Sequence, residues 1–207
     1  MPTNADSGVP PSGARARAPV PRLEPVSGPR MLACMWHAVF PTPLGAAAIL
    51  WHDAGVTGFR LPADEPDCVT GGLAGCGELV ALEAMPAGIA AIATRVQEHF
   101  AGTLHDFLDV PLDWTRVGAF QREVYRQTQT VKPGRTCSYG DIARSMGLPP
   151  ASSRAVGTAL GSNPWPLLVP CHRVVSSSGK MTGFSAPGGI RMKTRLLALE
   201  GAELPLA

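Results

Sequence analysis

The feature that most constrains the fold is a change in the spacing of apolar residues along the chain. Between residues 35 and 61, three short apolar runs, "MWHAVF", "GAAAILWH" and "GVTGFRL", are separated by the segments "PTPLG" and "HDAG". Short runs between turns rich in Pro and Gly are typical of strands in a small antiparallel sheet. Further along, apolar residues recur every three or four positions, as in helices. This order predicts an α+β fold in which a small sheet precedes most of the helices.

The first helical pattern completes a small N-terminal α/β domain, which we expect over residues 31–115. The segment "AGIAAIATRVQEHFAG" has apolar residues at helical spacing and ends at Gly102. We expect a further strand from Phe107 to Leu112. The apolar residues expected to face the sheet are Ile89, Ile92, Val96 and Phe100.

Residues 116–207 predict a second, mostly helical domain. In "GAFQREVYRQTQ", Phe120 and Val124 lie on one face of the expected helix, and Pro133 and Gly134 follow it. In "SYGDIARSMG", Ser138 is suited to cap a helix together with Asp141, three residues on.

A third helix is predicted in "PPASSRAVGTALGSNP", where Ser152 or Ser153 caps the helix and Val156 and Leu160 face inward. Two short helices joined by a tight turn make a helix-turn-helix, as in winged-helix-like domains, and the start of its second helix meets DNA. Arg154 occupies that position. Plain helix packing without DNA binding is the alternative.

Charge is distributed unevenly along the chain. Residues 1–30 are rich in Pro, Gly and Arg and predict a disordered tail of net charge +2. Residues 31–115 carry two Arg and ten acidic residues, a net of −8, whereas residues 116–207 carry twelve Lys or Arg and four acidic residues, a net of +8. The basic half favours a polyanionic partner such as nucleic acid, with a solvated basic face as the alternative.

Other compositional features exclude several classes of protein. No apolar run approaches the roughly 20 residues that span a bilayer, and the N-terminus lacks the apolar core of a signal peptide, so we expect a cytoplasmic, nucleoid-associated protein without membrane contact. Five cysteines, an odd number, indicate free thiols rather than a disulfide framework. Cys34 and His37 stand three apart, but no second pair matches them, so we predict no metal site.

The segment "LLVPCHRVV" places Cys171 beside His172 within an apolar run. A thiol reacts as its thiolate and needs a base, but neighbouring side chains on a strand point to opposite faces. Pro170 and the following "SSSG" make a bend here plausible. A buried structural cysteine with an incidental histidine is the alternative.

The motifs "SYGDIA", "SRAVGTALGSNP", "PCHRVV", "GFSAPGG" and "LALEG" follow one another between residues 118 and 201. In order and spacing they closely resemble the O6-alkylguanine-DNA alkyltransferases, or methylated-DNA–protein-cysteine methyltransferases. Over residues 36–115 the resemblance is weaker and rests mainly on "PTPLG" and "HFAGTLHDFLDVPLD".

The resemblance implies direct repair of O6-alkylguanine, and of O4-alkylthymine, in duplex DNA. Cys171 would take the alkyl group, His172 would receive the thiol proton through a water, and Glu200 would orient the imidazole. The resemblance also gives roles to further residues: Asn163 as a hinge, Tyr139 in rotating the nucleotide and bonding the base, Arg154 in filling the vacated stack, and backbone groups near Val174 and Ser185 in reading the base. Phe184 stands where many relatives have tyrosine, and "SAPGG" replaces a shorter loop of some members.

The thioether product has no good leaving group, so the expected protein acts once and needs no cofactor. We also expect it to act as a monomer on duplex DNA. Three alternatives remain open from the residues. A cysteine hydrolase would turn over repeatedly and need an oxyanion hole. A non-catalytic binder of alkylated DNA would not need Cys171, and a helix-turn-helix transcription factor would leave the thiol and Glu200 unexplained.

Overall fold

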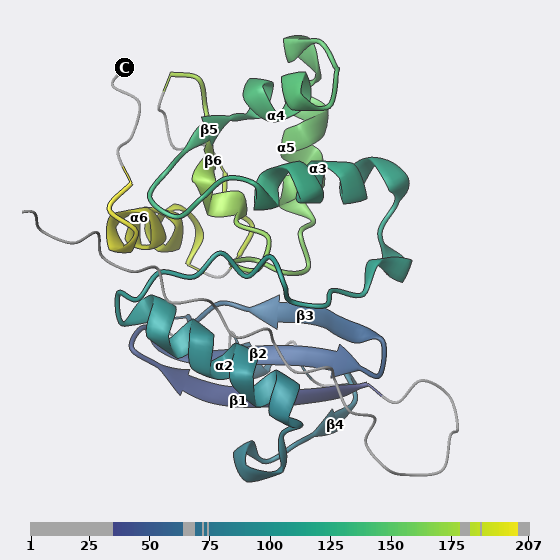
Figure 1. Cartoon of the computed structure of the whole chain (residues 1–207), viewed down its shortest axis with the longest axis vertical. Coiled ribbons are helices and arrows are strands. Elements are labelled where there is room, and N and C mark those ends of the chain that lie inside the picture. Colours follow the sequence, from purple (N-terminus) through teal and green to yellow (C-terminus); the bar gives the residue numbers. More distant parts are fainter. Residues whose placement is uncertain are drawn as a thin grey trace, which may run out of the picture.

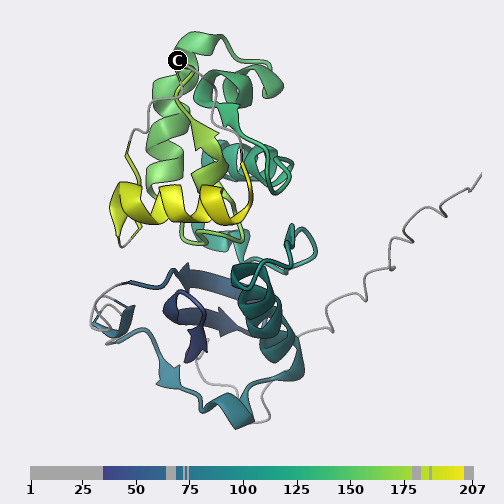
Figure 2. The same ribbon diagram turned by 90° about the vertical axis from the view of Figure 1, so that its left-hand side faces the viewer.

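The fold was analysed in a computed structural model that describes residues 35–63, 69–71, 73, 75–178, 183–186 and 188–202. The predicted tail of residues 1–30 lies outside these ranges. Figure 1 shows a sheet covered by one long helix, with a group of shorter helices beside it, and Figure 2 shows the two groups stacked. This is the α+β architecture that the sequence predicts. The domain boundary after residue 115 stays a prediction.

Four strands form the sheet in the order β3-β2-β1-β4. They are β1 (Trp36–Thr42), β2 (Gly45–His52), β3 (Gly55–Arg60) and β4 (Glu78–Leu79). The first three pair antiparallel, through the turns predicted from "PTPLG" and "HDAG", but β4 pairs parallel with β1. The predicted antiparallel sheet is confirmed for the first three strands. The sequence analysis did not predict β4, which joins the far edge of the sheet after the long connection that follows β3.

Helix α2 (Ala87–Phe100) follows the short 3-10 helix η1 (Leu82–Ala84) and packs on the sheet (Figure 1). All four residues predicted for its inner face are buried, which confirms the pattern: Ile89, Ile92, Val96 and Phe100.

The strand expected from Phe107 to Leu112 is wrong. Leu112 makes only a single bridge with Val56, and the rest of the segment is irregular. Phe107 adopts a left-handed backbone conformation with φ of 54°, and Pro111 has no N–H to donate to a neighbouring strand. Both features prevent a regular ladder.

The second group contains η2 (Trp114–Arg116), α3 (Ala119–Gln129), β5 (Cys137–Ser138), α4 (Tyr139–Ser145), η3 (Pro150–Ser152), α5 (Ser153–Gly161), η4 (Cys171–Arg173), β6 (Val174–Val175) and α6 (Gly189–Leu199). Strands β5 and β6 form a separate parallel pair. None of the helices in the described part of the chain is long and apolar enough to cross a membrane.

The predicted helix-turn-helix is present as α4, η3 and α5. Its cap is confirmed, since the Ser138 N–H donates to Asp141 at 2.7 Å and the Asp141 N–H donates to the Ser138 hydroxyl at 3.0 Å. Ser152 holds the cap position of α5, but its side chain makes no capping hydrogen bond. In α3, Val124 is buried as predicted, whereas Phe120 is 41% exposed because it lies in the first turn, beyond the core.

Hydrogen bonds at Val56 join the sheet to the second group. Its N–H donates to Pro111 at 2.8 Å, and its carbonyl accepts the Asp113 N–H at 2.9 Å and the Trp165 indole N–H at 2.8 Å. The N–H of Phe59 also donates to Pro164 at 2.9 Å. Strand β3 therefore holds the segment that leads from α5 to Cys171.

We predict that Gly55→Ala destabilises this junction. Gly55 has φ of +148°, and a Cβ atom there would lie 2.6 Å from the Pro111 carbonyl oxygen. Backbone strain and the clash together are expected to lower the free energy of unfolding by roughly 2 kcal/mol or more in urea titrations.

Gly102→Ala is the matched control, because Gly102 also has a positive φ, of +103°, but nothing lies within 4 Å of its added Cβ. It isolates the cost of backbone strain alone. Equal losses in the two variants would contradict the close approach at Gly55.

Candidate active site

Five of the predicted site residues line one cavity of about 750 Å³: Tyr139, Arg154, Cys171, Phe184 and Ser185. The cavity lies against the helix-turn-helix, since residues of α5 such as Gly157 also line it. Cys171 is only 9% exposed and lines this cavity. The thiol is therefore accessible to a group that enters from the helix-turn-helix side.

Cys171 and His172 lie together in a tight turn, which agrees with the bend predicted after Pro170. Residues Cys171–Arg173 form the 3-10 helix η4, in which the Arg173 N–H donates to the Pro170 carbonyl at 2.9 Å. Cys171 lines the cavity, while His172 is buried and meets Glu200. The turn thus lets two adjacent side chains serve one site.

Burial raises the pKa of the Cys171 thiol above its usual value. A hydrogen bond from Asn163 and the positive charge of Lys193 act in the opposite direction, because both favour the thiolate. The net result is a thiol that is protonated in the resting protein. Reaction therefore requires a base that takes the proton.

His172 has the form of such a base. Its Nε2 lies 3.1 Å from Glu200 Oε1, and its Nδ1 is buried without a hydrogen-bond partner among the described residues. An ionised Glu200 only accepts hydrogen bonds, so Nε2 carries the proton and Nδ1 keeps a lone pair. Burial lowers the pKa of His172 to about 4, although Glu200 acts to raise it. The imidazole is therefore neutral and able to accept a proton.

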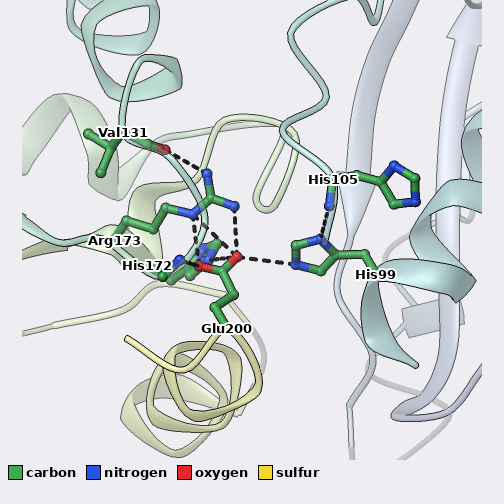
Figure 3. A network of polar contacts seen from close by, with 7 residues as sticks. His99, His105, Val131, His172, Arg173 and Glu200 are labelled. Carbon is green, nitrogen blue, oxygen red and sulfur yellow. Dashed lines mark hydrogen bonds and ion pairs between the residues drawn. The ribbon is translucent and has the colours of Figure 1, made fainter. Parts of the chain in front are cut away.

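Glu200, which follows the last residue of α6, is the centre of a buried polar network (Figure 3). Its Oε1 accepts from His172 and from His99, each at 3.1 Å, and from Arg173 Nη2 at 2.7 Å. Burial alone would raise the pKa of Glu200, but the hydrogen bonds from these three side chains outweigh it and hold that pKa well below its usual range. The carboxylate is therefore ionised.

Arg173 supplies the counter-charge. Its Nε donates to Glu200 Oε2 at 2.9 Å, and its Nη1 donates to the Val131 carbonyl at 2.7 Å. The guanidinium is fully buried, and a buried ion pair is tolerated when further hydrogen bonds satisfy both partners.

Lys193 of α6 is also buried. Its Nζ donates to the Val174 carbonyl at 2.7 Å and lies 5.9 Å from the centre of the Tyr139 ring. Burial lowers the pKa of Lys193, while the nearby Cys171 thiolate would raise it. Lys193 thus connects the thiol, the aromatic wall of the cavity and the backbone of β6.

Asn163 holds the segment between α5 and the thiol. Its Nδ2 donates to the Val169 carbonyl at 2.9 Å, and its Oδ1 accepts the Trp165 N–H at 3.0 Å. Asn163 and Cys171 both line a second cavity, of about 270 Å³. Val174 lies outside both cavity linings, so the role of its backbone in reading a base stays a prediction.

The sequence analysis missed His99, Arg173 and Lys193. A signal was present for His99, because it follows Ile92 and Val96 by seven and three residues on the inner face of α2. A polar side chain on a buried face needs a partner. No group of three His, Cys, Asp or Glu in the described residues could hold a metal ion, and Cys34 lies outside them.

Comparison with known proteins identifies the family of the chain. Residues 119–202 match the family model described as "6-O-methylguanine DNA methyltransferase, DNA binding domain". A methylated-DNA–protein-cysteine methyltransferase of Mycolicibacterium paratuberculosis is 47% identical over 120 residues, 58% of this chain and 70% of the relative. A DNA base-flipping protein of Thermus thermophilus is 38% identical over 172 residues, 81% of this chain and 99% of the relative.

Solved structures share the whole architecture. The crystal structure of Mycobacterium tuberculosis O6-methylguanine methyltransferase matches with a TM-score of 0.65 and 33% identity, over 84% of this chain and 96% of that one. The Mycobacterium tuberculosis OGT in complex with DNA matches with a TM-score of 0.63 and 34% identity, over 80% of this chain and 92% of that one.

The low pKa of His172 predicts a loss of stability in mild acid. The unfolded chain binds a proton at the ordinary value of 6.5, whereas the folded chain binds it only near 4. The free energy of unfolding should therefore fall as pH drops from about 6.5 to about 4, by roughly 3 kcal/mol from this residue. Urea titrations across this range measure the loss.

His172→Gln is the matched control, since Gln keeps a donor for Glu200 but does not titrate. The variant should lose the part of the pH dependence above about 4.5. Both proteins should lose stability at lower pH, because Glu200 binds a proton in the unfolded chain at pH values where the folded chain keeps it ionised. The same curve in both proteins would show that His172 is not the titrating group.

Proposed function

The chain belongs to the 6-O-methylguanine DNA methyltransferase family, and on this premise we propose that it repairs DNA by moving the alkyl group of O6-alkylguanine onto its own Cys171. One observation carries the proposal. Cys171 lines the cavity at the helix-turn-helix, and the residue that follows it is a buried neutral imidazole held by an ionised carboxylate. A thiol, a base and an orienting group in this order are what nucleophile activation requires.

The chemistry is a single displacement. The thiol proton passes toward Nδ1 of His172 through a water, and Sγ of Cys171 attacks the alkyl carbon. The new S–C bond forms as the C–O6 bond breaks, and guanine leaves after its oxygen or ring nitrogen regains a proton. The product thioether has no good leaving group, so one protein molecule repairs one base and needs no cofactor.

The cavity residues support the extrusion of the base. A lesion inside a duplex cannot reach a recessed thiol, so the nucleotide must rotate out at a cost of a few kcal/mol. Arg154, the second residue of α5, is exposed and lines the cavity together with Tyr139. Arg154 is suited to fill the vacated stack, and Tyr139 to bond the base; Phe184 and Ser185 also line the cavity.

Two other functions use the same architecture. The match to a DNA base-flipping protein over nearly the whole of that relative favours, as the second candidate, a protein that extrudes a damaged base without removing its alkyl group. A cysteine hydrolase would use the same thiol and imidazole but would release its product and turn over. Counting the groups transferred separates all three.

We expect transfer to stop at one methyl group per protein molecule when duplex DNA with O6-methylguanine is in excess. Mass analysis of the intact protein and of its peptides should find the group on the peptide that contains Cys171. Cys171→Ser should bind the duplex but transfer nothing, and His172→Gln should reach the same endpoint at a rate lower by about a hundredfold or more.

Repeated turnover would establish the hydrolase instead. Binding without any transfer would establish the base-flipping protein. A methyl group on another cysteine, such as Cys137, would remove Cys171 from the reaction.

Arg154→Ala is expected to slow transfer from duplex DNA by about tenfold, because the extruded base loses the group that holds its place in the stack. Transfer from the free base O6-methylguanine should be unchanged, since that reaction needs no extrusion. Nonspecific duplex affinity should fall only slightly, and it should decrease steeply with salt in both proteins.

Arg144→Ala is the matched control, because Arg144 is an exposed arginine of α4 that pairs with Asp141 and does not line the cavity. It should leave the transfer rate from duplex DNA unchanged. Equal slowing in both variants would indicate a general charge effect rather than a role in extrusion.

A further inference from the structure

His99 brings the sheet and α2 into contact with the candidate active site. It is the next-to-last residue of α2, is fully buried, and places Nε2 3.1 Å from Oε1 of Glu200 (Figure 3). The two residues are separated by 101 positions in the sequence. The same carboxylate oxygen accepts from His172, so His99 and His172 bind one atom.

The proton of His99 is fixed by the backbone. Its Nδ1 accepts the His105 N–H at 3.0 Å and therefore carries no proton of its own. The proton lies on Nε2, which donates to Glu200. The irregular segment that follows α2 thus selects the His99 tautomer that can hold the carboxylate.

We propose that His99 is a positioning residue for alkyl transfer, which fixes the Glu200 carboxylate so that His172 keeps its proton on Nε2 and its lone pair on Nδ1. This inference rests on the proposed function of Cys171, and it goes further by assigning part of the catalytic network to the N-terminal half of the chain. Without the His99 donor, the donors to Glu200 that remain among the described residues are Arg173, the Gly134 N–H and His172 itself. The tautomer of His172 then becomes less strictly determined.

His52 offers an internal comparison. Its Nδ1 accepts the Ala54 N–H at 2.9 Å, and its Nε2 lies 2.9 Å from Oδ2 of the buried Asp113. The local arrangement is the same as at His99, but Asp113 does not contact His172. Substitutions at His52 therefore reproduce the loss of a histidine–carboxylate bond without touching Glu200.

The test compares His99→Gln with His99→Asn. The amide nitrogen of Gln can take the place of Nε2 and donate to Glu200, whereas the shorter Asn can accept from the His105 N–H but cannot reach Glu200. We expect His99→Gln to transfer methyl within about threefold of the unchanged protein and His99→Asn to be slower by about tenfold, as for other residues that orient a reacting side chain. DNA affinity should be the same in both.

A second measurement does not depend on transfer. In nitrogen-15 spectra of the imidazole groups, His172 should show one neutral tautomer, with its proton on Nε2, in the unchanged protein and in His99→Gln. His99→Asn should give a shifted, averaged signal. His52→Gln and His52→Asn should alter stability but neither the rate nor the spectrum of His172.

The outcomes separate the two proposals. If no methyl group is ever transferred but the His172 signal follows the donor at position 99, the proposed function fails and the positioning role stands. If Gln and Asn at position 99 behave alike, in rate and in spectrum, His99 serves only packing and the inference is overturned.

Discussion

The structure around Cys171 depends on one buried carboxylate. Glu200 at the end of α6 accepts from Arg173 and His172 of η4, from His99 of α2 and from the Gly134 N–H after α3. An ionised carboxylate without such donors would cost several kcal/mol to bury. Each donor therefore stabilises the folded state only while the others hold their places. The need to satisfy Glu200 brings four distant segments together at the site.

Burial leaves the thiol of Cys171 protonated at rest. Burial raises the pKa of Cys171 and lowers the pKa of His172, so transfer of the proton between them is unfavourable in the closed site. Neutral thiols react slowly with oxidants and alkylating agents, whereas thiolates react fast. For the single alkyl transfer that we propose, a protonated resting thiol is an advantage, because Cys171 then stays unreactive until an alkylated nucleobase enters the cavity.

Elements set by local chemistry were predictable from the sequence. The Ser138–Asp141 cap and the inner face of α2 follow from residues a few positions apart, and both are confirmed. Strand β4 has only two residues, too few to show an alternation of apolar and polar side chains. Its pairing with β1 depends on the path of the chain after β3, which the local sequence does not reveal. Phe107–Leu112 has the composition of a strand, but a left-handed residue and a proline within it prevent the ladder.

The site divides in the same way. The family motifs indicate Cys171, His172 and Glu200, whereas His99 is found only when the fold brings the end of α2 to Glu200. Helices α2 and α6 nevertheless each carry a polar residue on the buried face. In α2, His99 follows Ile92 and Val96, and in α6, Lys193 precedes Leu196 and Leu197. A polar group on such a face must bond to a group of another element or to the backbone. A polar residue on the buried face of a helix therefore predicts a polar contact with another element, even before its partner is known; here the partners are Glu200 for His99 and the Val174 carbonyl for Lys193.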